Sequence, residues 1–343
     1  MPTVYTIQYL RGLAALAVLF QHATGMSQGN MVTVPAAAVD VFFTISGFVM
    51  VWAMIHRPLP AGEFAWHRIA RVMPIYWAVT LAVVALALVG LMPRMEITAE
   101  AVLKSLFFIP YDVTPPQPMP LVAPGWTLNY EAWFYLLCTV ALLLPRGAQI
   151  PGLFAILIGL AALGAVWRPE GAMLRVWTDA LLLEIAAGGA LALLFARGRV
   201  PGPRVGLALI GLALAMLVVQ EMFGLPGWPH SRFLLWGVPA ALIVLGALAL
   251  EPAREPWYLR PLHVLGDASY SLYLTHILVI ATVIRLVGTE SLALVLALCF
   301  ALAVTVGVLC FHLIERPAQR WLRKRPPRWA RPAPRAAGPV AAQ

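Results

Sequence analysis

Ionisable side chains inside long apolar segments are the residues of this sequence that could do chemistry. Arg11 and His22 lie in the first such segment, eleven positions apart. Eleven residues of an α-helix make about three full turns and rise roughly 16 Å, so both side chains lie on one stripe. Each has a structural explanation by itself, as a snorkelling anchor for Arg11 and a packing residue for His22. Because ionisable groups at membrane depth are costly, the pair on one stripe favours a functional site.

Two acidic residues are placed to act with His22. Asp40 and Glu131 each lie about one helical turn inside an apolar segment, at a depth that matches the depth of His22. A carboxylate beside an imidazole fixes its tautomer and raises its basicity, which suits a general base. We predict that the three groups converge, with either Asp40 or Glu131 as the partner of His22. A histidine–carboxylate contact that only locks two helices together is the alternative.

Two arginines in the connection after the second apolar segment suit a phosphate ligand. Arg68 and Arg71 are three positions apart and share one face if that stretch is helical. Forked guanidinium groups bind phosphate oxygens in pairs, and cofactors with adenosine diphosphate parts carry such phosphates. The excess of basic residues in cytoplasmic loops explains the same two arginines without a ligand.

Further polar residues lie deep in apolar segments. Ser269, Tyr273 and His276 fall on one face of a late segment, with His276 near mid-membrane, and Glu184 is similarly deep without an evident partner. Gly47 shares the face of Asp40, where it either permits close helix approach or leaves space for a ligand.

The elements that must position these residues are membrane helices. The chain has 343 residues, of which 61% are hydrophobic and 11% are charged, whereas soluble domains have about 25% charged residues. A spanning helix needs roughly 20 mostly apolar residues, so we predict an all-α polytopic integral membrane protein with about ten transmembrane helices. The predicted spans are 7–26, 36–55, 73–92, 126–144, 150–166, 175–195, 205–223, 232–250, 264–287 and 291–314.

The connections are short except at two places. Residues 56–72 and 94–125 are predicted as long loops, and the second contains prolines that favour an extended path. These prolines are Pro115, Pro116, Pro118 and Pro120. We divide the chain into a transmembrane domain over 1–322 and a basic Pro/Ala/Arg-rich cytoplasmic tail over 323–343 that we expect to be disordered. The cysteines, Cys138, Cys299 and Cys310, lie in apolar segments and are interpreted as packing residues.

The distribution of basic residues predicts the orientation. The net charge of +9 could suggest a nucleic-acid ligand, but the largest basic cluster follows the last apolar segment, as at a cytoplasmic end. With both termini in the cytoplasm, most basic residues fall inside, and we therefore predict no nucleic-acid partner. The inner residues are Arg57, Arg68, Arg71, Arg146, Arg197, Arg199, Arg204, Arg254, Arg260 and those after Ile314, and the outer ones are Arg94, Lys104, Arg168, Arg175, Arg232 and Arg285. Arg11 interrupts the first apolar run, so this segment is expected to be a retained helix rather than a signal peptide.

The polar residues, taken in order, make the chain resemble the bacterial acyltransferase family 3 membrane proteins, which acylate sugars and some small natural products. The resemblance covers nearly the whole chain, and Thr127 departs from it where serine is commoner. The matching features are Arg11 with His22; Asp40 with Phe42, Phe43, Ser46, Gly47 and Phe48; Arg68, Arg71 and Pro74; Trp126, Thr127, Glu131, Phe134 and Tyr135; Ser269 to Leu274 with His276; and Glu315, Arg316 and Pro317.

The resemblance implies an O-acyltransferase of the bacterial inner membrane that modifies a polysaccharide or related molecule. The donor would be cytoplasmic acyl-CoA, with acetyl-CoA the commonest, and the acceptor a hydroxyl group near the outer side, with no metal ion. Direct transfer and an acyl-histidine relay both stay open. The catalytic residues implied are His22, Asp40, Glu131 and Arg11, and the acyl-CoA site is assigned to Arg68, Arg71, Arg11, Ser269, Tyr273 and His276.

Two other function classes were weighed against acyl transfer. A proton-coupled secondary transporter or exporter could use His22, Asp40 and Glu131 as a proton relay, and a sensor or scaffold could use the helices alone. A transporter would more often show paired inverted repeats and broken helices, and the sequence has no clear pair. Arg68 and Arg71 also have no natural role in proton coupling, so acyl transfer is favoured. No oligomeric state is predicted.

Overall fold

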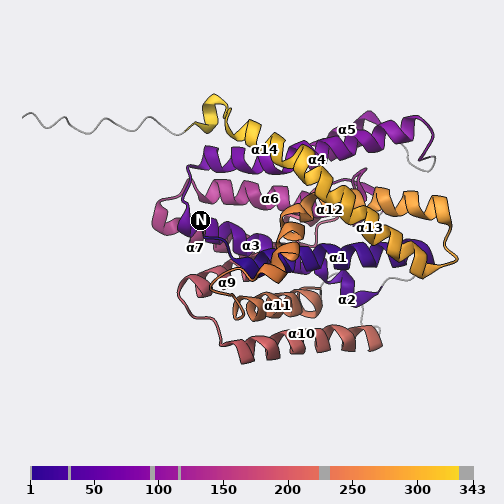
Figure 1. Cartoon of the computed structure of the whole chain (residues 1–343). Coiled ribbons are helices and arrows are strands. Elements are labelled where there is room, and N and C mark those ends of the chain that lie inside the picture. The colour runs from indigo at the N-terminus through magenta and orange to yellow at the C-terminus, as the bar shows by residue number, and fades with distance from the viewer. Residues whose placement is uncertain (1, 30–31, 93–96, 115–116, 224–231, 332–343) are drawn as a thin grey trace, which may run out of the picture.

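The chain folds into a bundle of helices whose axes run roughly along one direction (Figure 1). The computed structural model describes residues 2–29, 32–92, 97–114, 117–223 and 232–331. The α-helices are α1 (Tyr5–Gln28), α2 (Thr33–Ala36), α3 (Ala38–His56), α4 (Ala61–Leu88), α5 (Ala99–Leu106), α6 (Trp126–Ala141), α7 (Arg146–Trp167), α8 (Ala172–Trp177), α9 (Leu181–Ala196), α10 (Pro203–Phe223), α11 (Val238–Leu248), α12 (Arg260–Val287), α13 (Leu292–Cys310) and α14 (Arg316–Arg323). The shorter elements are η1 (Ala123–Gly125), η2 (Phe233–Gly237), η3 (Trp257–Leu259), η4 (Phe311–Glu315), η5 (Arg328–Ala330), β1 (Asp112–Thr114) and β2 (Gln117–Pro118).

The all-α membrane architecture is confirmed, but the predicted count of about ten spans is not. Seven helical segments of the described chain are long and apolar enough to cross a membrane. The other three predicted segments are helical and fall short in different ways: α1 carries several polar residues, α6 has 16 residues, and Phe233–Leu248 is a shorter apolar helix. The length and composition of the observed helices therefore give fewer candidate membrane spans than the apolar pattern of the sequence predicts.

Both predicted long loops contain regular structure. Helix α4 begins at Ala61, so residues 61–72 are helical and the loop prediction for 56–72 is wrong there. The helix continues because its first turns are amphipathic rather than apolar, a pattern that a search for apolar spans overlooks. Helix α5 and the antiparallel pair of β1 and β2 lie within 94–125. Arg94, Pro115 and Pro116 lie outside the described residues.

Several helix pairs approach each other at glycines, and two of these pairs involve the predicted site residues. A Cβ on Gly266 of α12 would lie 2.1 Å from the carbonyl oxygen of Gln8 on α1, and Gly12 of α1 faces α12 in the same way. A Cβ on Gly47 of α3 would lie 1.9 Å from the carbonyl oxygen of Ile185 on α9. Gly47 therefore permits close helix approach, the first of the two explanations that the sequence left open, because small residues let helix backbones meet.

The C-terminal helix packs on the start of α4. Trp66 donates a hydrogen bond from Nε1 to the carbonyl oxygen of Leu322 at 3.0 Å, and its ring meets the Trp329 ring edge-on with centroids 6.1 Å apart. Figure 1 shows α14 beside α4, with α10 on the opposite side of the bundle. Residues 323–331 of the expected tail thus belong to the described fold, whereas 332–343 lie outside it.

Candidate functional site

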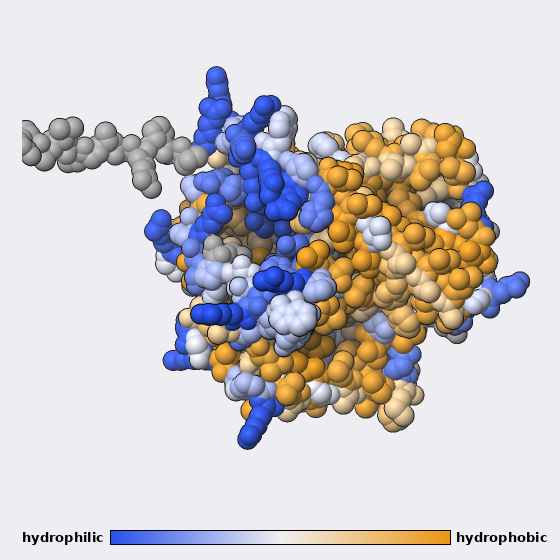
Figure 2. Space-filling model, in the orientation of Figure 1, coloured by the Kyte–Doolittle hydropathy of each residue, from blue (hydrophilic) through white to orange (hydrophobic). Residues whose placement is uncertain are grey.

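A cavity of about 290 Å³ lies among α1, α3, α4, α6 and α12. It begins beside Pro2 and Thr3 at the N-terminus and extends inward as far as Thr127 and Tyr273. Figure 2 shows a hollow surrounded by hydrophilic residues at the end of the bundle that carries the N-terminus, while apolar residues cover most of the rest of that face. The charged side chains that line the cavity are Arg11, Arg68, Arg71 and Glu131, so positive charge prevails there.

Helix α4 places Arg68 and Arg71 on the cavity wall, which confirms the prediction that they share a helical face. The Arg68 guanidinium carbon lies 5.4 Å from the centre of the Phe64 ring and 5.7 Å from that of Tyr135, distances at which cation–π attraction holds it in place. One of its terminal nitrogens contacts the Met50 sulfur at 3.8 Å. Its buried Nε has no hydrogen-bond partner among the described residues, so the group has donor capacity left for a ligand.

The positive charge of Arg71, unlike that of Arg68, is offset mainly by two nearby carboxylates. The carboxylates of Glu315 and Glu131 both attract its charge. Glu131 accepts a hydrogen bond from the Tyr135 hydroxyl one turn along α6, and Glu315 accepts one from Ser271 at 2.6 Å. Glu315 is thus part of the acidic surroundings of Arg71.

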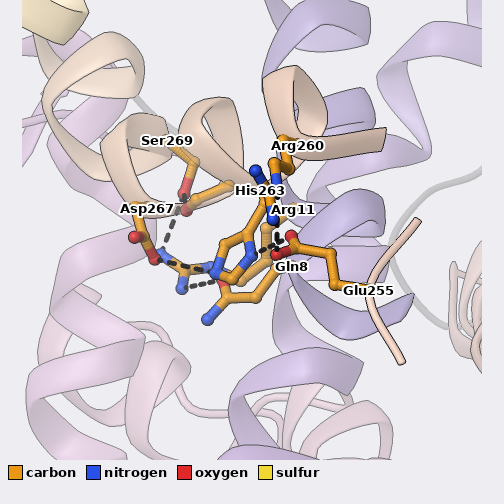
Figure 3. Close-up of polar contacts among 8 residues, drawn as sticks. Gln8, Arg11, Glu255, Arg260, His263, Asp267 and Ser269 are labelled. Atoms are coloured by element: carbon orange, nitrogen blue, oxygen red, sulfur yellow. Dashed lines mark hydrogen bonds and ion pairs between the residues drawn. The ribbon is translucent and has the colours of Figure 1, made fainter. Parts of the chain in front are cut away.

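Arg11 faces α12 at the inner part of the cavity. Its guanidinium donates to Gln8 Oε1 at 3.0 Å and to the Ser269 hydroxyl oxygen at 2.9 Å, as Figure 3 shows. The glycine contact between α1 and α12 explains this short reach. Arg11 lines the cavity and keeps further donors, and it lies beside Ser269, which is assigned to the same predicted acyl-CoA site.

A second polar group lies beside Arg11 at the N-terminal end of α12. His263 Nδ1 is 2.5 Å from Glu255 Oε1, and its Nε2 is 4.0 Å from Asp267 Oδ1 (Figure 3). Arg260 reaches the same Glu255 at 3.9 Å. This group was not predicted from the sequence, although a histidine and an aspartate four residues apart on a helix share a face. In the part of the chain that the structure describes, no cluster of three or more His, Cys, Asp or Glu residues could hold a metal ion.

Tyr273 closes the inner end of the cavity. Its hydroxyl lies 3.1 Å from the Thr127 hydroxyl, and its ring meets Phe42 edge-on with centroids 6.0 Å apart. The same ring is also next to His276, at 5.8 Å between ring centroids. Of the three residues assigned from this helix face, Ser269 and Tyr273 line the cavity and His276 does not.

His22 contacts a histidine and not the predicted carboxylates. His22 Nδ1 lies 3.0 Å from His276 Nε2, and the two rings are 5.0 Å apart. Arg11 and His22 thus both face α12, which confirms that they share one stripe. Among the described residues His22 makes no hydrogen bond to Asp40 or Glu131, because Asp40 binds Arg232 and Glu131 accepts from Tyr135.

Asp40 belongs to a closed ion pair with Arg232. Arg232 Nε and one terminal nitrogen each donate to one Asp40 oxygen at 3.0 Å, which is the bidentate fork geometry. The guanidinium lies over the Trp236 ring at 4.7 Å and near Trp126 at 5.7 Å. Buried Glu184 is a neighbour of this pair. A buried carboxylate requires a cation nearby, and that requirement was the signal that could have pointed to Arg232.

Comparison with known proteins gives one family and several relatives. The family model described as an acyltransferase domain matches residues 4–312. The exopolysaccharide production protein ExoZ of Rhizobium meliloti (strain 1021) is 35% identical over 301 residues, covering 87% of this chain and 93% of ExoZ. The acyltransferase MdmB of Streptomyces mycarofaciens is 27% identical and covers 95% of this chain and 94% of MdmB.

A further relative is the putative peptidoglycan O-acetyltransferase YrhL of Bacillus subtilis (strain 168). It is 24% identical to this chain, with 90% of the chain and 54% of YrhL covered. No solved structure matches the chain.

Proposed function

Because this chain belongs to the acyltransferase 3 family and is a membrane O-acyltransferase, we propose that it moves an acyl group from acyl-CoA to a carbohydrate hydroxyl. Acetyl is the first candidate for the acyl group. The observation that carries this proposal is the arginine-lined cavity, which begins at the N-terminal end of the bundle and ends one ring away from a pair of histidines. The family match over residues 4–312 does not favour the transporter alternative.

The donor site lies in the part of this cavity that is nearest its mouth, at the N-terminal end of the bundle. Coenzyme A carries a diphosphate and a third phosphate, and Arg68 and Arg71 present two forked cations side by side on the wall. The unpartnered Arg68 Nε and the excess of positive charge among the lining residues fit such an anion. Arg57 and Arg323 add further positive charge near these two arginines. The pantetheine arm then runs past Arg11 toward Tyr273, with the thioester at its tip.

The acyl transfer takes place beyond Tyr273, at His22. The acceptor hydroxyl gives its proton to His22 as its oxygen attacks the thioester carbonyl carbon. The new oxygen–carbon bond forms, the carbon–sulfur bond breaks, and the CoA thiolate receives the proton from His22. The rings of Phe42 and Tyr273 line the cavity and contact each other, and the Tyr273 ring also neighbours His276, the partner of His22, so we assign them to the passage of the acyl group.

The acceptor approaches from the other end of the helix pair. His22 lies near the C-terminal end of α1 and Arg11 near its start, so a donor that enters beside Arg11 leaves the far side of His22 for the hydroxyl. The relative ExoZ is an exopolysaccharide production protein, which supports a sugar of an extracellular polysaccharide as the acceptor. This arrangement requires a bacterial inner-membrane protein with both termini in the cytoplasm and the transmembrane domain over residues 1–322.

The proposal is tested with the full chain purified in lipid nanodiscs. Radiolabelled acetyl-CoA is supplied with de-acetylated exopolysaccharide, and label transfer is followed together with release of CoA thiol. We expect transfer by the native chain and its loss in His22→Ala, with the thermal unfolding temperature of that variant unchanged. Full transfer by His22→Ala would refute the role of His22 as base. Absence of transfer with any polysaccharide offered, together with absence of CoA binding, would refute the donor. Label on the rapidly quenched native protein that hydroxylamine releases, and that is absent from His22→Ala, would select the acyl-histidine relay over direct transfer.

A further inference from the structure

The histidine pair contains a second imidazole that acyl transfer by His22 does not by itself require. We propose that His276 is a positioning residue that holds His22 in the tautomer with its proton on Nδ1, so that Nε2 is the base. This inference rests on the proposed function, because it assigns a reactive nitrogen to the proposed base. It gives His276 a role in place of the carboxylate that orients histidine in many hydrolases.

The contacts of His22 determine which nitrogen carries the proton. His22 Nδ1 lies 3.1 Å from the backbone carbonyl oxygen of Val18 and 3.0 Å from His276 Nε2. The carbonyl oxygen is only an acceptor, so an unprotonated Nδ1 would face it lone pair to lone pair. A protonated Nδ1 donates to both neighbours. His22 therefore carries its proton on Nδ1, and its Nε2 keeps a free lone pair.

The same contact then determines the tautomer of His276. If His22 donates, His276 Nε2 must accept, and the neutral His276 ring carries its proton on Nδ1. The side chain is 1% exposed, so water does not compete for Nε2, while Nδ1 has no hydrogen-bond partner among the described residues. Its ring is held between the Tyr273 ring on its own helix and the His22 ring on α1. The two rings thus form one directed hydrogen bond, from α1 to α12.

A neutral acceptor has a different chemical effect from a carboxylate. When His22 Nε2 takes the proton of the acceptor hydroxyl, the Nδ1 proton is held more tightly toward His276 Nε2, which stabilises the imidazolium. No net charge is added to the site before the reaction, because both rings are neutral. The carboxylates that could have taken this place are used elsewhere: Asp40 binds Arg232, and Glu131 accepts from Tyr135. The proton returns from His22 to the CoA thiolate, so His276 ends each cycle unchanged.

The tautomer is measured directly by nitrogen-15 NMR of the full chain labelled at histidine, in nanodiscs and without substrate. The sequence has 7 histidines, and the spectrum of His22→Gln identifies the His22 signals by difference. We expect Nδ1 of His22 to give the protonated shift and Nε2 the bare one. The opposite assignment in the native chain would overturn the inference whether or not the protein transfers acyl groups. The expected assignment in a chain that transfers nothing from acyl-CoA would instead refute only the proposed function.

Substitutions at His276 separate positioning from packing. The amide oxygen of glutamine reaches the place of Nε2, whereas the shorter asparagine reaches only the level of Nδ1. We expect His276→Asn to lower kcat at least about a hundredfold, the scale of a correctly placed general base, with the KM for acetyl-CoA unchanged. His276→Gln should recover at least tenfold of that loss. Equal kcat values for the two variants, or a native kcat in His276→Asn, would contradict the positioning role.

Discussion

Arg68 and Arg232 occupy comparable surroundings in two parts of the bundle and differ in what faces their charge. Both guanidinium groups lie against two aromatic rings, Phe64 and Tyr135 for the first and Trp126 and Trp236 for the second. Arg232 also grips Asp40 with two hydrogen bonds. Arg68 lines a cavity and leaves Nε without a partner in the described structure.

The comparison shows that a buried arginine can have either of two roles in this bundle. A buried guanidinium with a bidentate carboxylate has used its strongest donors, and it joins α3 to the helix that begins beside η2. A guanidinium held by rings alone is positioned while its donors stay available. We infer that the Arg232 pair holds helices together and that Arg68 is prepared for an anion. Three predictions test this division.

The largest effect is expected at the closed pair. Asp40→Ala leaves Arg232 buried beside Glu184 without its fork partner, and breaking such a pair costs about 3–5 kcal/mol. We therefore expect a large drop in the thermal unfolding temperature in detergent. The double variant Asp40→Ala with Arg232→Met should regain much of this stability, because no unpaired cation remains. If Asp40→Ala unfolds at the native temperature and loses only acyl transfer, Asp40 is a catalytic group and the division fails.

A smaller effect on binding, without an effect on stability, is expected at the open arginines. Arg68→Ala with Arg71→Ala should weaken the binding of CoA about tenfold or more, since a hydrogen bond to a charged group contributes about 1.5–3 kcal/mol. Isothermal titration with CoA measures this change, and pantetheine serves as a matched ligand without the nucleotide phosphates. The weakening should be seen for CoA and not for pantetheine. Unchanged CoA affinity would reduce both arginines to signals of membrane orientation.

The smallest effect is expected at Arg11, which donates hydrogen bonds to two side chains and also lines the cavity. Ser269→Ala removes one of the two hydrogen bonds that orient Arg11, a loss of about 1 kcal/mol, which corresponds to roughly fivefold weaker CoA binding. Thr282→Ala is the matched control on the same helix, because its exposed hydroxyl bonds only the Leu278 carbonyl. Equal affinities of the two variants would show that Arg11 needs no support from α12.

Local spacing predicted the parts of the site that lie on single helices. Arg11 and His22 share a stripe and Arg68 and Arg71 share a face because helical periodicity alone determines this, and both sets lie as predicted. The ordered polar motifs also predicted the family, which the match over residues 4–312 confirms. The helical class followed from composition, because a membrane excludes most other folds.

The partners across helices could not be predicted in the same way. Depth along the membrane placed His22, Asp40 and Glu131 at one level, but each helix can rotate about its own axis at fixed depth. Asp40 turns toward Arg232, which is 192 positions away in the chain. His22 turns toward α12 because the glycine contact draws α1 against that helix. Such rotations depend on packing between distant segments, which no spacing within one segment reveals.

The glycine contact between α1 and α12 also has a consequence for motion. At Gly12 and Gly266 the backbones of α1 and α12 approach so closely that there is no room for a side chain between them. We therefore expect α1 and α12 to move as one rigid unit. Arg11 and His22 both lie on α1, so the fixed distance between them sets the length of donor that fits. Any opening between the cavity and the histidines must then come from rotation of ring side chains such as Phe42 and Tyr273. The turnover rate would in that case be limited by rotamer changes of Phe42 and Tyr273 rather than by a rearrangement of helices.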